Sequence, residues 1–285
     1  MAGHQVDYKR YYPVQDYPFP WTVPTFFDLM PETFLGMPRP DELLVEPILE
    51  PNSYDLVILG YAPWFLSPSL LVQGLLEKEE VKSLIANKPI ITVTGCRNMW
   101  LNAMEKLKEL LLVRKARLVG NIALVDPASN VVSLITLSAW LFAGKKEGFM
   151  GGIFGPSGVT DAQIQHASKF GEIIHAYLSK GDFSGMQPEL VKADAVAVNP
   201  NLIPIETRAI RLFGLWANFI RKKGGPGNPN RYFRLKLFLY YIVAALSVIG
   251  PIVSVFAWIG RTLSPKKINK QMAYFQGLEW DKNGI

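Results

Sequence analysis

The chain has 285 residues, of which 49% are hydrophobic, and its formal net charge is +6. This length allows one sizeable core with room for a second element. A single cysteine, Cys96, excludes an internal disulfide framework and agrees with a reducing cytoplasm. No CxxC motif, HExxH motif or cluster of His, Cys and Asp has the spacing of metal ligands, so metal binding has no support.

The N-terminal segment is crowded with aromatic and proline residues. The prolines are Pro13, Pro18, Pro20 and Pro24, and at this density they forbid a helix and favour an extended segment. The eight aromatic residues are Tyr8, Tyr11, Tyr12, Tyr17, Phe19, Trp21, Phe26 and Phe27. Two interpretations stay open: the segment walls an apolar substrate pocket, or it packs over the sheet through its aromatic side chains.

A strand, an aromatic loop and a helix follow one another in residues 54–77. Residues 55–60 form a short apolar run of the kind that is buried on both faces of a parallel sheet. The run breaks at Gly60 into the aromatic loop 61–67, and residues 68–77 predict a helix. The alternative is an ordinary strand and helix whose loop aromatics only pack locally.

Two further units of the same kind come next along the chain. Residues 88–94 predict a buried strand that ends in Gly95-Cys-Arg-Asn-Met-Trp100, and a helix is expected over 101–112. A third strand is expected over 116–125, before Asp126. Three such units predict an α/β protein with a doubly wound parallel sheet, in which ligands bind at the carboxyl ends of the strands.

The aromatic loop resembles the flavin-covering loop of flavodoxin-like flavoproteins, including the quinone reductases. The residues that match that pattern are Pro63, Trp64, Phe65, Pro68, Ser69, Leu71 and Gly74. The resemblance implies an FMN cofactor, with the next strand end supplying the other wall of the site through backbone N–H groups. The expected cofactor-binding residues are Tyr61, Ala62, Pro63, Trp64 and Phe65 from the first loop, and Gly95, Cys96, Arg97 and Asn98 from the second.

Over a wider span the chain is similar to one flavodoxin-like family of Bacteroidetes, the dialkylresorcinol condensing enzymes or aromatases of flexirubin-type pigment biosynthesis. The segments that carry this resemblance are 17–21, 26–34, 64–69, 95–100 and 155–159. It implies a flavin-dependent oxidoreductase that aromatises a dialkylcyclohexanedione to a resorcinol, and a partner ketosynthase that makes the ring. The substrate is expected to be a lipid-like small molecule.

One part of the flavodoxin-like pattern is missing from the sequence. Residues 6–14 read as the second strand of that fold, so the first strand and the loop that holds the flavin phosphate at a helix N-terminus are not found. The chain is therefore expected to start late, to replace the strand by another segment, or to be degenerate. Under each explanation we expect weak flavin binding.

An uncharged run at 131–144 has 14 residues, too few to span a bilayer, and it predicts a core, pocket-lining or interfacial helix. A glycine-rich loop follows at 148–158, without the spacing of a phosphate loop. Thr160 and Gln163 have the spacing of a capping box, and a helix is expected from there to about Leu178. Residues 1–204 are thus assigned to the flavodoxin-like domain, and 205–285 to a basic, hydrophobic tail.

The tail differs in charge from the rest of the chain. Residues 1–204 have 17 Lys and Arg against 21 Asp and Glu, whereas 205–285 have 13 against 3. Residues 237–260 carry no charge over 24 positions, which is long enough to cross a bilayer. Basic residues flank both ends of this run, and Gly250-Pro251 interrupts it.

These features favour a hairpin in the membrane interface with both ends on one side. A single span and a hairpin packed on the protein stay open. Nucleic acid is a less suitable partner for a segment this apolar. Because residues 1–20 lack a hydrophobic run, we expect the protein at the cytoplasmic face of the inner membrane.

Three functions follow: the aromatising oxidoreductase, a general NAD(P)H-dependent flavin or quinone reductase, and a non-catalytic flavodoxin-like binding protein that has lost its cofactor. The sequence does not identify the catalytic acid or base. Tyr61, Arg97 and Asp126 lie at predicted strand ends, where functional residues collect. Oligomeric state stays open, with a homodimer as one alternative.

Overall fold

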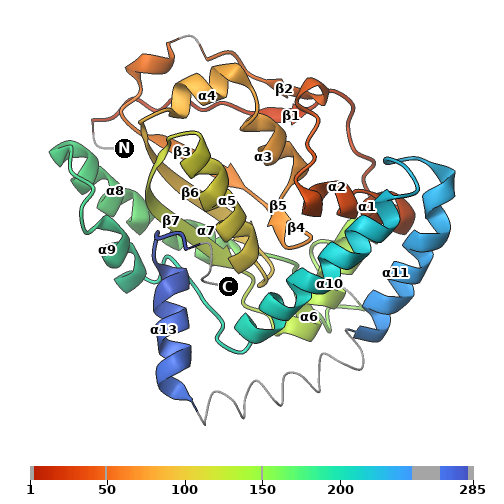
Figure 1. Cartoon of the computed structure of the whole chain (residues 1–285). Helices are drawn as coiled ribbons and strands as arrows, with labels where there is room; N and C mark the ends of the chain where they lie inside the picture. Colours follow the sequence, from red (N-terminus) through yellow and green to blue (C-terminus); the bar gives the residue numbers. More distant parts are fainter. Residues whose placement is uncertain (1–2, 49, 149, 246–263, 282–285) are drawn as a thin grey trace.

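A parallel sheet of three strands lies at the centre of the computed structural model, which describes residues 3–48, 50–148, 150–245 and 264–281 (Figure 1). The strands are β3 (Val57–Tyr61), β6 (Pro89–Cys96) and β7 (Arg117–Val125), in the order β3–β6–β7. The three parallel strands predicted within residues 54–125 and the mixed α/β class are therefore confirmed. Beyond β7, an isolated parallel bridge joins Ala123 to Val196.

Helices connect these strands and cover the sheet. Between β3 and β6 lie a short hairpin of β4 (Pro63–Trp64) and β5 (Ser67–Pro68), then α3 (Leu70–Leu75) and α4 (Glu79–Ile85). Helix α5 (Leu101–Val113) connects β6 to β7. The chain continues through α6 (Asn130–Ala143), α7 (Asp161–His166), α8 (Ser168–Lys180) and α9 (Met186–Lys192). The predicted capping box is confirmed, because Thr160 and Gln163 exchange hydrogen bonds at the start of α7.

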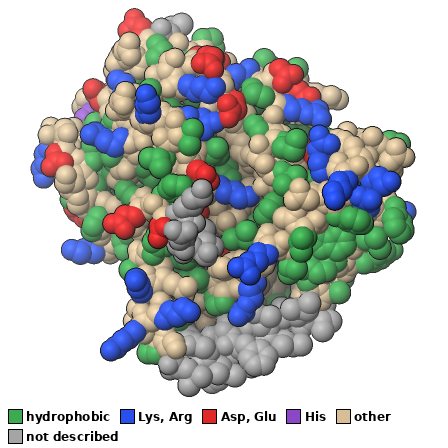
Figure 2. Space-filling model, in the orientation of Figure 1, with side chains coloured by type: hydrophobic (Ala, Val, Ile, Leu, Met, Phe, Trp, Pro, Cys, Tyr) green, Lys and Arg blue, Asp and Glu red, His purple; other side chains and the backbone are tan. Residues whose placement is uncertain are grey.

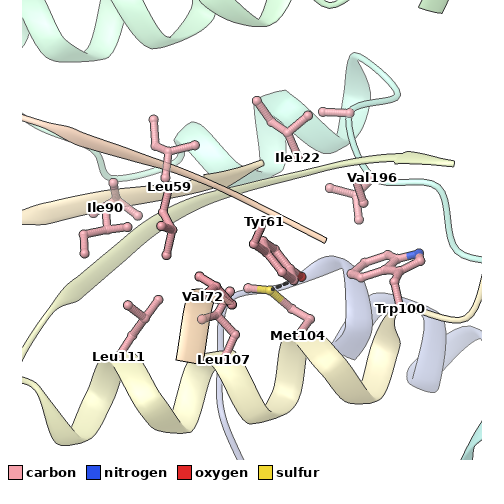
Figure 3. Close-up of a cluster of buried hydrophobic side chains, with 14 of the residues drawn as sticks. Leu59, Tyr61, Val72, Ile90, Trp100, Met104, Leu107, Leu111, Ile122 and Val196 are labelled. Carbon is pink, nitrogen blue, oxygen red and sulfur yellow. Dashed lines mark hydrogen bonds between the residues drawn. The ribbon is translucent and has the colours of Figure 1, made fainter. Parts of the chain in front are cut away.

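The main hydrophobic core lies between the sheet and α5. Met104, Leu107 and Leu111 extend from α5 toward the sheet, at the helical spacing that places them on one face (Figure 3). On the opposite face, β7 approaches α9 closely at Gly120, where an added Cβ would lie 2.9 Å from Met186 Cε. A side chain at position 120 would require the end of the Met186 side chain to move.

The N-terminal segment differs from the prediction. Residues 6–14 do not join the parallel sheet. Only Tyr11–Pro13 form a strand, β1, which pairs antiparallel with β2 (Leu43–Val45) in a separate two-stranded sheet. The hydroxyl of Tyr11 donates to the carbonyl of Gly60 on β3, so the segment passes β3 without extending its ladder. Pro13 cannot donate a ladder hydrogen bond, which agrees with the end of β1 at this residue and disfavours a place for the segment inside the parallel sheet.

A second hydrophobic cluster joins the N-terminal helices to the basic tail. Its members come from α1 (Val23–Asp28), α2 (Met30–Leu35), α10 (Ile203–Arg221) and α11 (Tyr232–Ala244). The fully buried residues Met30 and Phe238 meet in this cluster. The remaining described elements are α13 (Pro265–Gln276) and the 3-10 turns Pro40–Glu42, Pro51–Ser53 and Pro229–Arg231.

Buried charges reinforce the same contact. Arg231 is fully buried and donates from both terminal nitrogens to the two carboxylate oxygens of Glu32, each at 3.0 Å. Its Nε lies 2.9 Å from Oδ1 of Asp28, and Arg221 approaches Glu32 at 3.3 Å. We call Arg231, Asp28 and Glu32 the ionic clamp. It joins residues about 200 positions apart, on both sides of the boundary predicted at residue 204.

The apolar run predicted to enter a membrane, 237–260, lies partly outside the described residues, which stop at 245 and resume at 264. Among the helices that the structure describes, none has the length and apolar composition needed to cross a bilayer. The interfacial hairpin and its alternatives therefore stay predictions.

Candidate functional site

The aromatic loop after β3 is folded into a tight hairpin. Trp64 pairs with Ser67, which leaves Phe65 and Leu66 as the two turn residues. Both have positive φ, 49° and 61°, as a two-residue type I′ turn requires. Bulky residues are rare in this region and each costs about 1–2 kcal/mol there. Strain of this kind collects at functional sites.

The aromatic side chains of this hairpin are covered by the N-terminal segment. Trp64 lies 5.9 Å from Tyr17 and 6.3 Å from Trp21, measured between ring centroids. Phe65 lies 4.9 Å from Phe26. Of the two interpretations of the N-terminal aromatics, packing by ring contacts is therefore observed. The side chains of Trp64 and Phe65, which were expected to face a flavin, are thus covered by a second layer of aromatic rings.

The loop after β6 is held by the start of α6. Arg97 Nη1 donates to the carbonyl of Asn130 at 3.0 Å, and Asn98 Nδ2 donates to Oδ1 of the same residue at 3.1 Å. Gly95 is exposed, and a Cβ added there would meet Val159 Cγ2 at an ordinary contact distance of 3.6 Å. Arg97 and Asn98 thus act as supports for the loop.

The two predicted loops meet at the carboxyl edge of the sheet. Tyr61 on β3 is paired with Thr94 on β6, and the Thr94 hydroxyl donates to the Tyr61 carbonyl at 3.0 Å. Neighbouring strands are about 4.8 Å apart, so the loops that follow them are adjacent. Ala62 and Gly95 leave exposed backbone at this edge. The predicted juxtaposition of the two loops is confirmed.

Tyr61 and Cys96 face away from solvent. Burial raises the pKa of the Tyr61 phenol, whose hydroxyl donates to the sulfur of Met104 at 3.5 Å (Figure 3). Burial also raises the pKa of the Cys96 thiol, and its Sγ lies 3.8 Å from the carbonyl of Leu124. Neither group is present as a nucleophilic anion near neutral pH, so Cys96 has the environment of a space-filling residue.

Asp126, the other strand-end candidate, arranges the neighbouring loops. Its two carboxylate oxygens accept hydrogen bonds from the backbone N–H groups of Ala128, at 2.8 Å, and Gly158, at 3.1 Å. These contacts bring the glycine-rich loop 148–158 to the carboxyl end of β7. Asp126 therefore has the role of a loop anchor.

Helix N-termini at this edge are capped by the protein itself. Ser69 and Ser129 accept the capping hydrogen bonds of α3 and α6. At α5, Oε1 of Glu206 accepts from the backbone N–H of Asn102 at 2.6 Å. A carboxylate thus lies where the first turn of α5 would attract a phosphate.

Glu206 is the residue that the sequence analysis missed. It is 2% exposed, and burial raises its pKa to about 7. Within the part of the chain that the structure describes, its second oxygen, Oε2, has no hydrogen-bond partner. The signal was present in the sequence, because Glu206 is the only acidic residue between Asp194 and Glu279.

Lys106 is a second missed residue, beneath the hairpin. Its Nζ donates to the carbonyl of Phe34 and to the hydroxyl of Ser67, each at 2.8 Å, and lies 3.8 Å from the centre of the Phe34 ring. Burial lowers its pKa to about 8, so it can exchange a proton near neutral pH.

An open groove of about 900 Å³ lies at the other end of the sheet. The amino end of β7, at Arg117, forms one side, and α13 and the loop between α8 and α9 form the others. A much smaller cavity, of about 10 Å³, lies beside Glu206 and Asn102. In the described residues the groove is remote from the two predicted loops.

These observations bear on the fit of FMN. The exposed backbone at Ala62 and Gly95 can face a flat ring, but the described residues supply no phosphate cradle at this edge. The residues therefore do not fit the complete cofactor. Within the described ranges, no group of three His, Cys, Asp or Glu side chains is placed to hold a metal ion.

Comparison of the chain with protein-family models, with curated proteins and with solved structures gives no match.

Proposed function

We propose that the protein is a flavodoxin-like, flavin-dependent oxidoreductase that acts on a lipid-like cyclic dione in dialkylresorcinol biosynthesis. The observation that carries the proposal is the meeting of loops 61–67 and 95–100 at the carboxyl edge of a parallel sheet. Doubly wound proteins bind flat cofactors at this edge. The strained turn at Phe65 and Leu66 supports the same location.

The proposal includes weak cofactor binding. Ala62 and Gly95 offer backbone to the ring, whereas Glu206 occupies the first turn of α5. Phosphate capture at a helix N-terminus contributes much of the affinity for a nucleotide. A flavin held only by its ring is expected to dissociate during gel filtration.

A non-catalytic binding protein is the second candidate. The covering of Trp64 and Phe65 by Tyr17, Trp21 and Phe26 favours it, because these rings would have to separate before the aromatic loop could contact a ligand. A general flavin or quinone reductase on the same scaffold would need the same rings to separate.

Titration with FMN, followed by quenching of flavin fluorescence, separates these candidates. We expect saturable quenching for the full chain and its loss in Gly95→Leu, whose side chain would project from the exposed edge. Gly171→Leu is the control, since Gly171 is also exposed, has an ordinary φ and lies on α8. Absence of quenching in the full chain, or equal quenching in the two variants, would reject the oxidoreductase proposal in favour of the binding protein.

A further inference from the structure

The outward faces of α10 and α11 carry exposed apolar side chains. On α10, Leu215 is 69% exposed, and Leu212 and Phe219 lie on the same side of the helix. On α11, Phe233 is 70% and Tyr240 is 72% exposed. Isolated exposed apolar residues are common, but a patch that follows two neighbouring helices marks an interaction surface.

The charge around this patch has one sign. Residues 205–245 include eight Lys and Arg and one acidic residue, Glu206. Glu206 and one of the cations, Arg231, are buried. The seven other cations, some of them half-buried, are Arg208, Arg211, Arg221, Lys222, Lys223, Arg234 and Lys236. Figure 2 shows blue and green side chains gathered together over α10 and α11.

We propose that the outward faces of α10 and α11, which we call the basic–apolar face, form a docking surface for an anionic lipid bilayer. Apolar side chains surrounded by Lys and Arg are the composition of helices that lie in the membrane interface. Anionic headgroups complement a surface that exposes cations and no acidic residue. A protein partner would have to be both acidic and apolar to match this surface.

Continuity along the sequence supports the same partner. Residues 246–260, directly after the described part of α11, carry no charge. The ionic clamp and the packing of α10 against α2 fix the basic–apolar face to the rest of the molecule. Glu206 on α10 contacts the first turn of α5, so α10 connects the basic–apolar face to the sheet-centred core.

This inference does not depend on flavin binding, and co-sedimentation of the full chain with vesicles tests it. Vesicles of equal parts phosphatidylcholine and phosphatidylglycerol are expected to sediment the protein, and pure phosphatidylcholine vesicles to sediment much less. Each Lys near the surface contributes about a fivefold factor to the partition coefficient onto anionic vesicles. The double variant Lys222→Ala, Lys223→Ala should therefore lower that coefficient about 25-fold. Phe233→Ser combined with Tyr240→Ser should lower it at least about tenfold.

The control replaces equally exposed apolar residues elsewhere. Leu112 and Val113 are 57% and 73% exposed at the far end of α5, so Leu112→Ser with Val113→Ser should leave partitioning unchanged. Circular dichroism confirms that each variant is folded. Equal sedimentation of the α11 and α5 variants would overturn the proposal. Self-association of the wild-type chain without vesicles would also overturn the proposal if Phe233→Ser abolished it. The basic–apolar face would then bind a second copy of the chain.

Discussion

The sheet-centred core and the helical region formed by α1, α2, α10 and α11 are stabilised in different ways. In the core, apolar side chains at regular spacing on β6 and α5 bury against one another beside the hydrogen-bonded backbones of the sheet, and a buried ion pair, Glu105–Lys108, lies along α5. In the helical region, a smaller apolar cluster surrounds the ionic clamp, whose partners are about 200 residues apart. The first region depends mainly on apolar packing, whereas the second also depends on the neutralisation of charges that are buried between distant segments of the chain.

The largest expected effect comes from breaking the ionic clamp. Arg231→Met leaves the buried Asp28 carboxylate without its cation and leaves Glu32 with only the more distant Arg221, so it should lower the free energy of unfolding by about 3–5 kcal/mol. Urea unfolding measures this change. Arg10→Met is the control, because Arg10 pairs with Glu46 at the surface and its loss should leave the unfolding midpoint unchanged. Equal midpoints for the two variants would mean that the clamp contributes no more than a surface pair.

The core gives a matched comparison on a single helix. Leu107 is fully buried against the sheet, so Leu107→Ala should cost roughly 2–5 kcal/mol of unfolding free energy through lost burial and the cavity left behind. Leu112, on the same helix, is 57% exposed, and Leu112→Ala should change stability little. Thermal unfolding of both variants checks this difference. If Leu107→Ala lowered the unfolding free energy no more than Leu112→Ala, Leu107 would not be packed against the sheet as described.

Glu206 links the two regions, and its contribution depends on pH. Because burial raises its folded-state pKa to about 7, above the ordinary value of 4.5, the stability associated with its protonation is present below pH 4.5 and is lost as the pH rises through 7. Glu206→Gln keeps a hydrogen-bond acceptor for Asn102 and removes this titration. The variant should gain on the order of 2–3 kcal/mol relative to the wild type between pH 5 and pH 8.

Urea unfolding at both pH values measures that difference. Glu147→Gln is the control, because it makes the same chemical change at an exposed position in the loop after α6 and should change stability little. Parallel behaviour of the wild type and Glu206→Gln across this range would show that the Glu206 carboxyl has an ordinary pKa.

The smallest expected effect concerns a local signal on an exposed helix, α7. Thr160→Ala removes the capping box at the start of α7 and should cost about 0.5–2 kcal/mol. Gln165→Ala, in the same helix and without a capping role, should change stability by less. Measured unfolding free energies in the reverse order would show that the cap is not formed in solution.

The strands and helices of the sheet-centred core could be predicted because the patterns that indicate them lie in continuous segments of the sequence. Apolar runs followed by helix patterns located β3, β6 and β7, and the carboxyl ends of parallel strands were then expected to bring loops 61–67 and 95–100 together. Thr160 and Gln163 identified a helix start for the same reason. The assignment of residues 6–14 to the sheet was wrong because it extended a resemblance to a segment in which Pro13 disfavours ladder pairing.

The helical region and the details of the candidate site depend on long-range contacts. Nothing in the neighbourhood of Glu32 indicates that it meets Arg231, and periodicity does not report that Glu206 caps α5. Likewise, the aromatic residues of loop 61–67 were predicted to face a flavin, whereas Tyr17 and Phe26 supply their neighbours. A one-dimensional pattern gives the type of a side chain but not the distant partner that covers it.

The most direct test of the account compares the affinities of FMN and riboflavin for the full chain by fluorescence titration. The two ligands share the ring and differ in the phosphate. Because the backbone at Ala62 and Gly95 can face the ring while Glu206 occupies the first turn of α5, we predict weak binding of both ligands with similar dissociation constants. Tight binding of FMN with a strong preference over riboflavin would contradict the account, since it would require a phosphate site at this edge of the sheet.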